Sequence, residues 1–132
     1  MKTQIQIRTQ RKKSGFTLIE VIAVLVLLGI LAAIAVPKYI DMAENARSRA
    51  LDAAVAELNG REALTWGNVM ISDTGYTDDA TVFAAVDTVL SSDYSWSAAP
   101  TVSGGTLSFQ GATGVALSRT ASLGTQPGTW SR

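Results

Sequence analysis

The sequence predicts an α+β protein in which one long N-terminal helix packs on a small antiparallel sheet. Two observations support this fold class. Residues 16–67 combine an unbroken apolar stretch with a segment whose apolar residues recur at helical spacing. Residues 95–119 instead contain short runs of Ser, Thr, Val and aromatic residues separated by Gly and Pro, which is typical of strands and turns. At 132 residues, the chain has room for one compact domain and one accessory segment.

The first element is the apolar segment of residues 16–36, which has the sequence FTLIEVIAVLVLLGILAAIAV. As a helix that rises about 1.5 Å per residue, it is about 31 Å long, which matches the hydrocarbon core of a bilayer. Residues 1–15 contain five Lys or Arg and no acid. The positive-inside rule therefore places this basic leader in the cytoplasm and residues 38–132 on the other side of the membrane.

The second element is an amphipathic continuation of the same helix over residues 37–67. Pro37 lacks an amide hydrogen and its ring crowds the preceding turn, so we expect a kink near this residue. Beyond it, small and aliphatic residues keep helical spacing while most charged residues lie on other faces. Glu57 and Arg61 are spaced to form an i,i+4 ion pair. We expect the helix to end near residues 67–68, which are Gly and Asn.

Residues 68–132 form the predicted globular head. Residues 68–80 have the composition of a connecting loop, and residues 81–90 are expected to form a short helix. Asp78 or Asp79 is available as the N-cap of this helix. The tail of the chain, residues 124–130, shows no clear periodicity.

Short strands are expected in the C-terminal part of the head, at Ser95–Ala98, Thr101–Val102, Thr106–Gln110 and Val115–Arg119. Such a series of strands separated by turns predicts an antiparallel meander. Polar and apolar residues alternate strictly over Thr106–Gln110, so Leu107 and Phe109 should face the long helix. Other strands should add three residues to this face: Trp96, Val115 and Leu117.

Composition excludes several kinds of function. The net charge is zero, but residues 16–132 carry six basic and eleven acidic side chains. This balance leaves no basic face for a phosphate backbone, so stable binding of nucleic acid is not expected. The chain has no Cys and no His. Thiolate nucleophiles, imidazole bases and ordinary zinc sites are therefore excluded, and we expect no catalytic residue, metal site or cofactor.

Glu20 is the one acidic residue inside the apolar segment. A charge at bilayer depth costs roughly 2.5–3.5 kcal/mol on insertion scales, so it needs compensation. In one interpretation, Glu20 lies close enough to the interface to reach water, Lys12 or Lys13. In the other, a cut between Gly15 and Phe16 creates an α-amino cation four residues before Glu20 on the same helical face. Pairing with that amine, within one chain or between copies, makes both charges tolerable in an assembled bundle.

Residues 13–20, KSGFTLIE, resemble the signature of type IV prepilins, in which a short basic leader ends in Gly before FTLIE. The resemblance covers residues 11–60 well and the remainder in general plan. In that family a membrane-embedded prepilin peptidase cuts after the glycine and methylates the new N-terminus. The resemblance therefore implies cleavage between Gly15 and Phe16 and N-methylation of Phe16.

Three further residues fall where the family keeps functional positions in its long helix. Glu20 matches the assembly glutamate, which neutralises the new N-terminus. Gly29 and Pro37 match the family's glycine and proline, which implies helix packing at Gly29 and a kink at Pro37.

The resemblance implies a structural subunit and not an enzyme. The implied partners are copies of the same chain in a helical filament, the prepilin peptidase, and the assembly platform with its ATPase machinery. The implied location is the inner membrane before assembly, with a cytoplasmic leader and a periplasmic head. After assembly it is an extracellular pilus or a periplasmic pseudopilus.

The sequence leaves three alternatives. A pseudopilin of a type II secretion system would share the anchor. Major pseudopilins often bind calcium in their C-terminal loops, whereas this chain has no acidic residue after Asp93 to help bind it. A signal peptidase could release a soluble domain after residues 33–35, AIA, although the apolar segment is longer than the usual 7–15 or so residues. A membrane-anchored enzyme would have to use residues 78–79 (Asp-Asp) or 91–92 (Ser-Ser), which lack a companion base.

Overall fold

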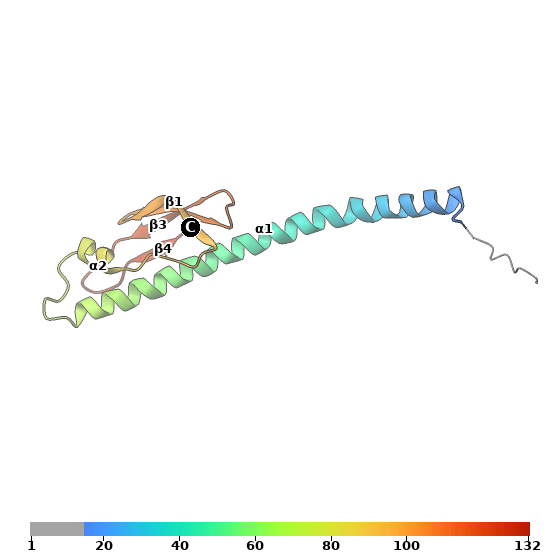
Figure 1. The fold of residues 1–132 in the computed structure, drawn as a ribbon. Coiled ribbons are helices and arrows are strands. Elements are labelled where there is room, and N and C mark those ends of the chain that lie inside the picture. Colours follow the sequence, from blue (N-terminus) through green and yellow to red (C-terminus); the bar gives the residue numbers. More distant parts are fainter. Residues whose placement is uncertain (1–14) are drawn as a thin grey trace, which may run out of the picture. The chain divides into compact units, whose positions relative to one another are not determined.

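The computed structural model describes residues 15–132, and Figure 1 shows their fold. Within these residues lie two helices, α1 (Leu18–Met70) and α2 (Asp79–Ala85), and four strands, β1 (Tyr94–Thr101), β2 (Gly104–Phe109), β3 (Val115–Thr120) and β4 (Thr129–Ser131). The chain divides into two compact units, one ending at Asp41 and the other comprising Met42–Arg132. Helix α1 contributes to both. The predicted leader lies outside the described residues except for Gly15.

The first unit is the N-terminal part of α1. The helix begins at Leu18 and continues without a break through Pro37. The kink expected near Pro37 stays a prediction. Every residue from Gly15 to Asp41 is exposed, although nearly all side chains up to Val36 are apolar. Among the described helices, α1 alone has a stretch long and apolar enough to cross a membrane. Because water contact with such a surface is unfavourable, this unit requires an apolar environment.

In the second unit, one face of α1 packs on the sheet (Figure 1). Four residues of α1, spaced three or four positions apart, are buried: Leu51, Ala54, Leu58 and Glu62. This spacing places them on a single helix face. The three apolar residues of this face form one core with three buried residues of the sheet: Leu107, Leu117 and Trp130. The predicted α+β fold, a long helix packed on a small antiparallel sheet, is confirmed.

The strands form an antiparallel meander in the order β1-β2-β3-β4. Trp96 of β1 pairs with Leu107 of β2, which pairs in turn with Val115 of β3. Leu107 is fully buried, and Phe109 packs partly buried against the same core. The inward direction predicted for Leu107 and Phe109 is therefore confirmed.

Both helices differ in length from the sequence-based predictions. Helix α1 ends at Met70, two residues beyond the expected end. Helix α2 is shorter than the predicted 81–90: Asp78 caps it by accepting a hydrogen bond from the Thr81 amide at 2.7 Å, and the backbone is already extended at Val86. The Asp87 side chain then accepts from the Val89 amide at 2.9 Å, which favours a turn over continued helix.

The sheet differs at both of its edges. Strand β1 is continuous through Pro100, where the sequence predicts two short strands. An edge strand tolerates proline because the missing amide can face away from the sheet, and the pairing with β2 is irregular between Ala98 and Thr101. At the other edge, β4 forms in the tail, for which the sequence predicts no strand.

The position of β4 is explained by Asn59 of α1. The Trp130 amide donates to Asn59 Oδ1 at 2.6 Å, and Asn59 Nδ2 donates to the Trp130 carbonyl at 3.0 Å. This side-chain amide satisfies the backbone of β4 as a neighbouring strand would. The Trp130 ring is buried and contacts the rings of Phe83 and Trp96.

A largely buried group of charges lies within the second unit. Arg119 points inward from β3 and donates hydrogen bonds to both carboxylate oxygens of Glu62 and both of Asp79. It also donates to the Val102 carbonyl at 3.0 Å. All five guanidinium N–H groups thus have acceptors, which offsets much of the cost of burying the charge.

The two carboxylates of this charge cluster have further donors. Trp130 Nε1 donates to Glu62 at 3.2 Å, while the Ser122 amide and hydroxyl donate to Asp79 at 2.6 and 2.7 Å. The hydrogen bond from Arg119 is the largest of the effects that lower the pKa of Asp79 from 3.8 to about 2. The cluster therefore links α1, α2, β3 and β4.

Candidate functional site

The predicted cleavage point lies just before α1. Gly15, Phe16 and Thr17 are outside the helix, and the Phe16 side chain is 89% exposed. Among the described residues beyond its chain neighbours, no atom lies within 4 Å of a Cβ built on Gly15. The peptide bond between Gly15 and Phe16 therefore lies in a non-helical, exposed segment.

Thr17 and Glu20 form a reciprocal pair at the start of α1. The Thr17 amide donates to Glu20 Oε2 at 2.7 Å, and the Thr17 hydroxyl donates to the same oxygen at 2.9 Å. The Glu20 amide lies 3.3 Å from Thr17 Oγ1. The Thr17 carbonyl accepts the first helical hydrogen bond, from Val21 at 3.3 Å. Thr17 is thus the N-cap, and Glu20 is the third helical residue of a capping box.

Sequence reasoning missed this pair, although the signal was present. Residues 17–20, TLIE, have the Thr-x-x-Glu spacing of a capping box, followed by an apolar run. The two interpretations of Glu20 involve water, Lys12, Lys13 and the new amine at Phe16, and neither involves Thr17. Lys12 and Lys13 lie outside the described residues.

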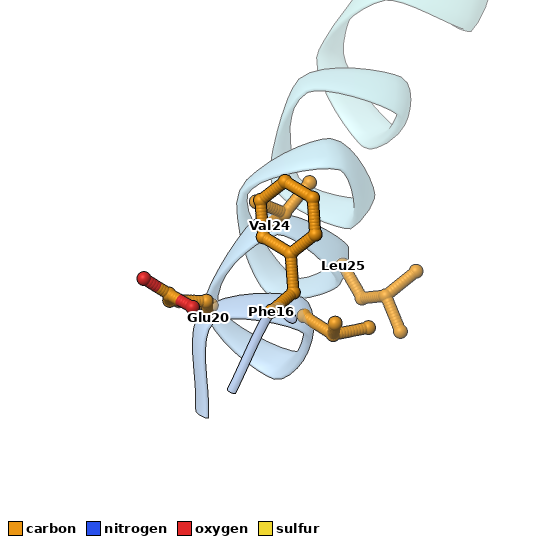
Figure 2. Close-up of a pocket in the computed structure, with 6 residues that line it drawn as sticks. Phe16, Glu20, Val24 and Leu25 are labelled. Carbon is orange, nitrogen blue, oxygen red and sulfur yellow. The ribbon is translucent and has the colours of Figure 1, made fainter. Parts of the chain in front are cut away.

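Phe16 and Glu20 border the same open hollow on the side of α1, with Val21, Ala23, Val24 and Leu25. Figure 2 shows the Glu20 carboxylate pointing out to one side of the helix. The other lining side chains are apolar. The arrangement brings Phe16 and Glu20 to one region of the surface, where the new amine is predicted to appear.

Gly29 and Pro37 lie further along the exposed part of α1. A Cβ built on Gly29 has no atom within 4 Å, so the fold of the single chain does not require glycine there. Both residues are separated from Glu20 by two or more helical turns. Their roles in packing and bending stay predictions.

The acids proposed for an enzymatic alternative serve the fold. Asp78 caps α2, and Asp79 binds Arg119 and Ser122. In the part of the chain that the structure describes, no group of three or more acidic side chains is placed to hold a metal ion.

One of the comparisons with known proteins concerns the same N-terminal region. The family model of the prokaryotic N-terminal methylation motif matches residues 10–36. The chain is 42% identical over 53 residues to the type IV narrow pilus major component PilA5 of Thermus thermophilus. This match covers 40% of the chain and 46% of the relative, so the chain spans about half of the relative's length. No solved structure matches.

The matched motif includes Gly15, Phe16, Glu20 and Gly29, and the relative is a pilus component. In the described residues, the motif covers the non-helical residues 15–17 and the exposed apolar start of α1. The chain therefore carries an N-terminal methylation motif at residues 10–36 and is similar to a type IV pilus component.

Proposed function

We propose that this chain is a structural subunit of a type IV pilus-like filament. The observation that carries the proposal is that the methylation motif, residues 10–36, extends over the exposed apolar start of α1. An exposed apolar helix of this length needs lipid before assembly and neighbouring helices after it. A filament with these helices in its core provides both environments in succession.

Processing is the first step of the proposal. A prepilin peptidase cuts between Gly15 and Phe16 and methylates the Phe16 amine. The exposed, non-helical backbone at Gly15 supports this assignment, because a helix would have to unwind before its peptide bonds could enter an active site.

Assembly is the second step. The processed subunit leaves the inner membrane through an assembly platform driven by an ATPase, and residues 16–36 pack against the same segments of other copies. Exchanging lipid contacts for helix contacts yields little hydrophobic free energy, so close packing and polar contacts decide how subunits are arranged. Gly29 lets helices approach closely there, and Pro37 provides a kink where the helix leaves this core.

Glu20 is proposed to direct that arrangement. Its carboxylate lies four residues after the Phe16 amine, and amine and carboxylate can neutralise each other in one chain or between neighbouring copies. A buried charge pair contributes little net stability but strongly disfavours arrangements that leave either charge unpaired. The pair therefore selects the register of a new subunit.

A surface pilus is favoured over a periplasmic pseudopilus because the matched relative is a pilus component. The two structures would share processing and the helical core. Electron microscopy of cells labelled with an antibody to the head distinguishes them, because only a pilus places the head on filaments outside the cell.

The proposal is tested by mass spectrometry of the protein isolated from its native cell. We expect the N-terminal peptide to begin at N-methylated Phe16. A replacement of Gly15 by Val should leave the chain uncut, because the bulky side chain would obstruct the peptidase, while Gly60→Val provides a control with an added side chain far from the cut. A native protein that begins at Met1 or at Val36 would overturn the proposal.

A further inference from the structure

We propose that Thr17 is the positioning residue for Glu20, and that it holds this carboxylate both before and after removal of the leader. The inference rests on the proposed function, because the carboxylate is positioned for the amine that cleavage creates. It adds a residue to the assembly site for which the resemblance implies no role.

The first argument is the local geometry. Thr17 supplies two donors to one oxygen, Glu20 Oε2, at 2.7 and 2.9 Å. Among the described residues, no donor is bound to Oε1. One carboxylate oxygen is therefore held by the helix terminus, and the other remains available to a cation.

The second argument is that these contacts survive processing. Cleavage breaks the bond between Gly15 and Phe16, whereas the Thr17 amide belongs to the next peptide bond along the chain. The Thr17 N–H and hydroxyl thus remain donors in the mature subunit, and the methyl group is attached to a different nitrogen. The capping box can hold Glu20 in the membrane and in the filament alike.

The third argument concerns the cost of a carboxylate in lipid. Two charge-assisted hydrogen bonds and the positive end of the helix dipole stabilise the carboxylate where Glu20 lies. Glu20 is then tolerated before any neighbour arrives. Thr17 also limits the side-chain rotamers of Glu20, so less conformational entropy is lost when the amine of Phe16, from the same or a neighbouring copy, binds Oε1.

The test compares two replacements of Thr17 in the full chain in its native cell. Thr17→Val keeps the side-chain shape and the amide but loses the hydroxyl, and Thr17→Ser keeps the hydroxyl. We expect both variants to be cut and methylated, as mass spectrometry would show. The filament yield should fall about five- to tenfold for Thr17→Val, the size expected for loss of an N-cap, and stay near wild type for Thr17→Ser.

A second measurement asks whether Thr17 acts through Glu20. In a Glu20→Gln background, whose own filament yield is reduced, adding Thr17→Val should change the yield by less than about twofold, because coupled residues are not additive. Independent, additive effects would overturn the inference. So would a normal yield for Thr17→Val, a Thr17→Ser variant as defective as Thr17→Val, or loss of cleavage in Thr17→Val, which would assign Thr17 to the peptidase instead.

These outcomes are separate from a failure of the proposed function. If wild-type protein is neither cut nor assembled, the proposed function fails. If wild-type protein assembles, Glu20→Gln impairs it and Thr17→Val does not, only the role of Thr17 fails.

Discussion

Asp79 illustrates how a single side chain depends on its surroundings. The hydrogen bonds that Arg119 and Ser122 donate hold the pKa of Asp79 at about 2, below its ordinary value of 3.8. A carboxylate whose pKa is lower in the folded chain stabilises the fold at pH values above its unfolded pKa. That contribution is lost as the pH falls from about 4 through about 2.

Replacing Asp79 by Asn should therefore weaken the head in a pH-dependent way. We expect the free energy of unfolding to drop by about 2 kcal/mol near pH 7, and the difference from wild type to shrink towards pH 2. Denaturant unfolding in detergent at several pH values measures this. Asp93→Asn is the control, because Asp93 is exposed and forms no ion pair with other described residues. A difference that is the same at every pH would contradict the explanation.

At the scale of elements, the C-terminal strand is held by contacts with distant parts of the chain. Gly128 directly precedes β4 and passes close to the buried charge cluster. A Cβ at Gly128 would lie 2.6 Å from Glu62 Oε1, 2.8 Å from Arg119 Nη2 and 2.9 Å from the Thr120 carbonyl. The carbonyl belongs to the backbone of β3, so it cannot move aside easily.

Gly128→Ala should therefore displace β4 and destabilise the head. The expected cost is roughly 1–3 kcal/mol, the range for an overpacked core. Gly60→Ala is a matched control: a Cβ there has no atom within 4 Å, and alanine favours the helix by up to about 1 kcal/mol. Thermal unfolding followed by circular dichroism measures the difference in unfolding midpoint between the two variants. Equal midpoints for the two variants would show that the close approach at Gly128 is unimportant.

The helices and strands also differ in how well local sequence patterns predict them. The long helix and the inward face of β2 follow from periodicity in neighbouring residues, and both are observed. The end of α2 and the continuity of β1 depend on single turn residues and on edge position, and these predictions were wrong. At these two places, the local propensity for helix or strand competes with hydrogen bonds of similar free energy, so the sequence pattern alone does not decide where the element ends.

At the scale of the whole molecule, the distribution of charge predicts how the precursor lies in the membrane. Residues 1–15 are basic and residues 16–36 apolar, while the remaining 96 residues carry six basic and ten acidic side chains. The positive-inside rule then predicts that the leader stays in the cytoplasm and that the head is translocated.

Protease treatment of spheroplasts that carry the uncut precursor tests this orientation. We expect protease outside the cell to digest residues 38–132 and to leave an epitope tag at Met1 intact. After lysis, the tag should be digested as well, which controls for its intrinsic sensitivity. Digestion of the tag in intact spheroplasts would reverse the predicted orientation.

The sequence by itself determined the features of this protein that depend on neighbouring residues. The basic leader, the predicted cut before Phe16, the apolar helix and Glu20 within it lie in one short segment, so motif and composition point to them together. The Thr17–Glu20 capping box is also a local feature of this type, because only three positions separate its two residues.

Only the tertiary structure decided the interior of the head. Arg119 is buried against Glu62, which precedes it by 57 residues, and Trp130 is bonded to Asn59, which precedes it by 71. Neither partner can be inferred from local pattern, because an arginine in a strand and an asparagine in a helix ordinarily face water. Their contacts follow from the packing of α1 on the sheet, which brings distant donors and acceptors together around the buried Arg119 and the half-buried Asn59.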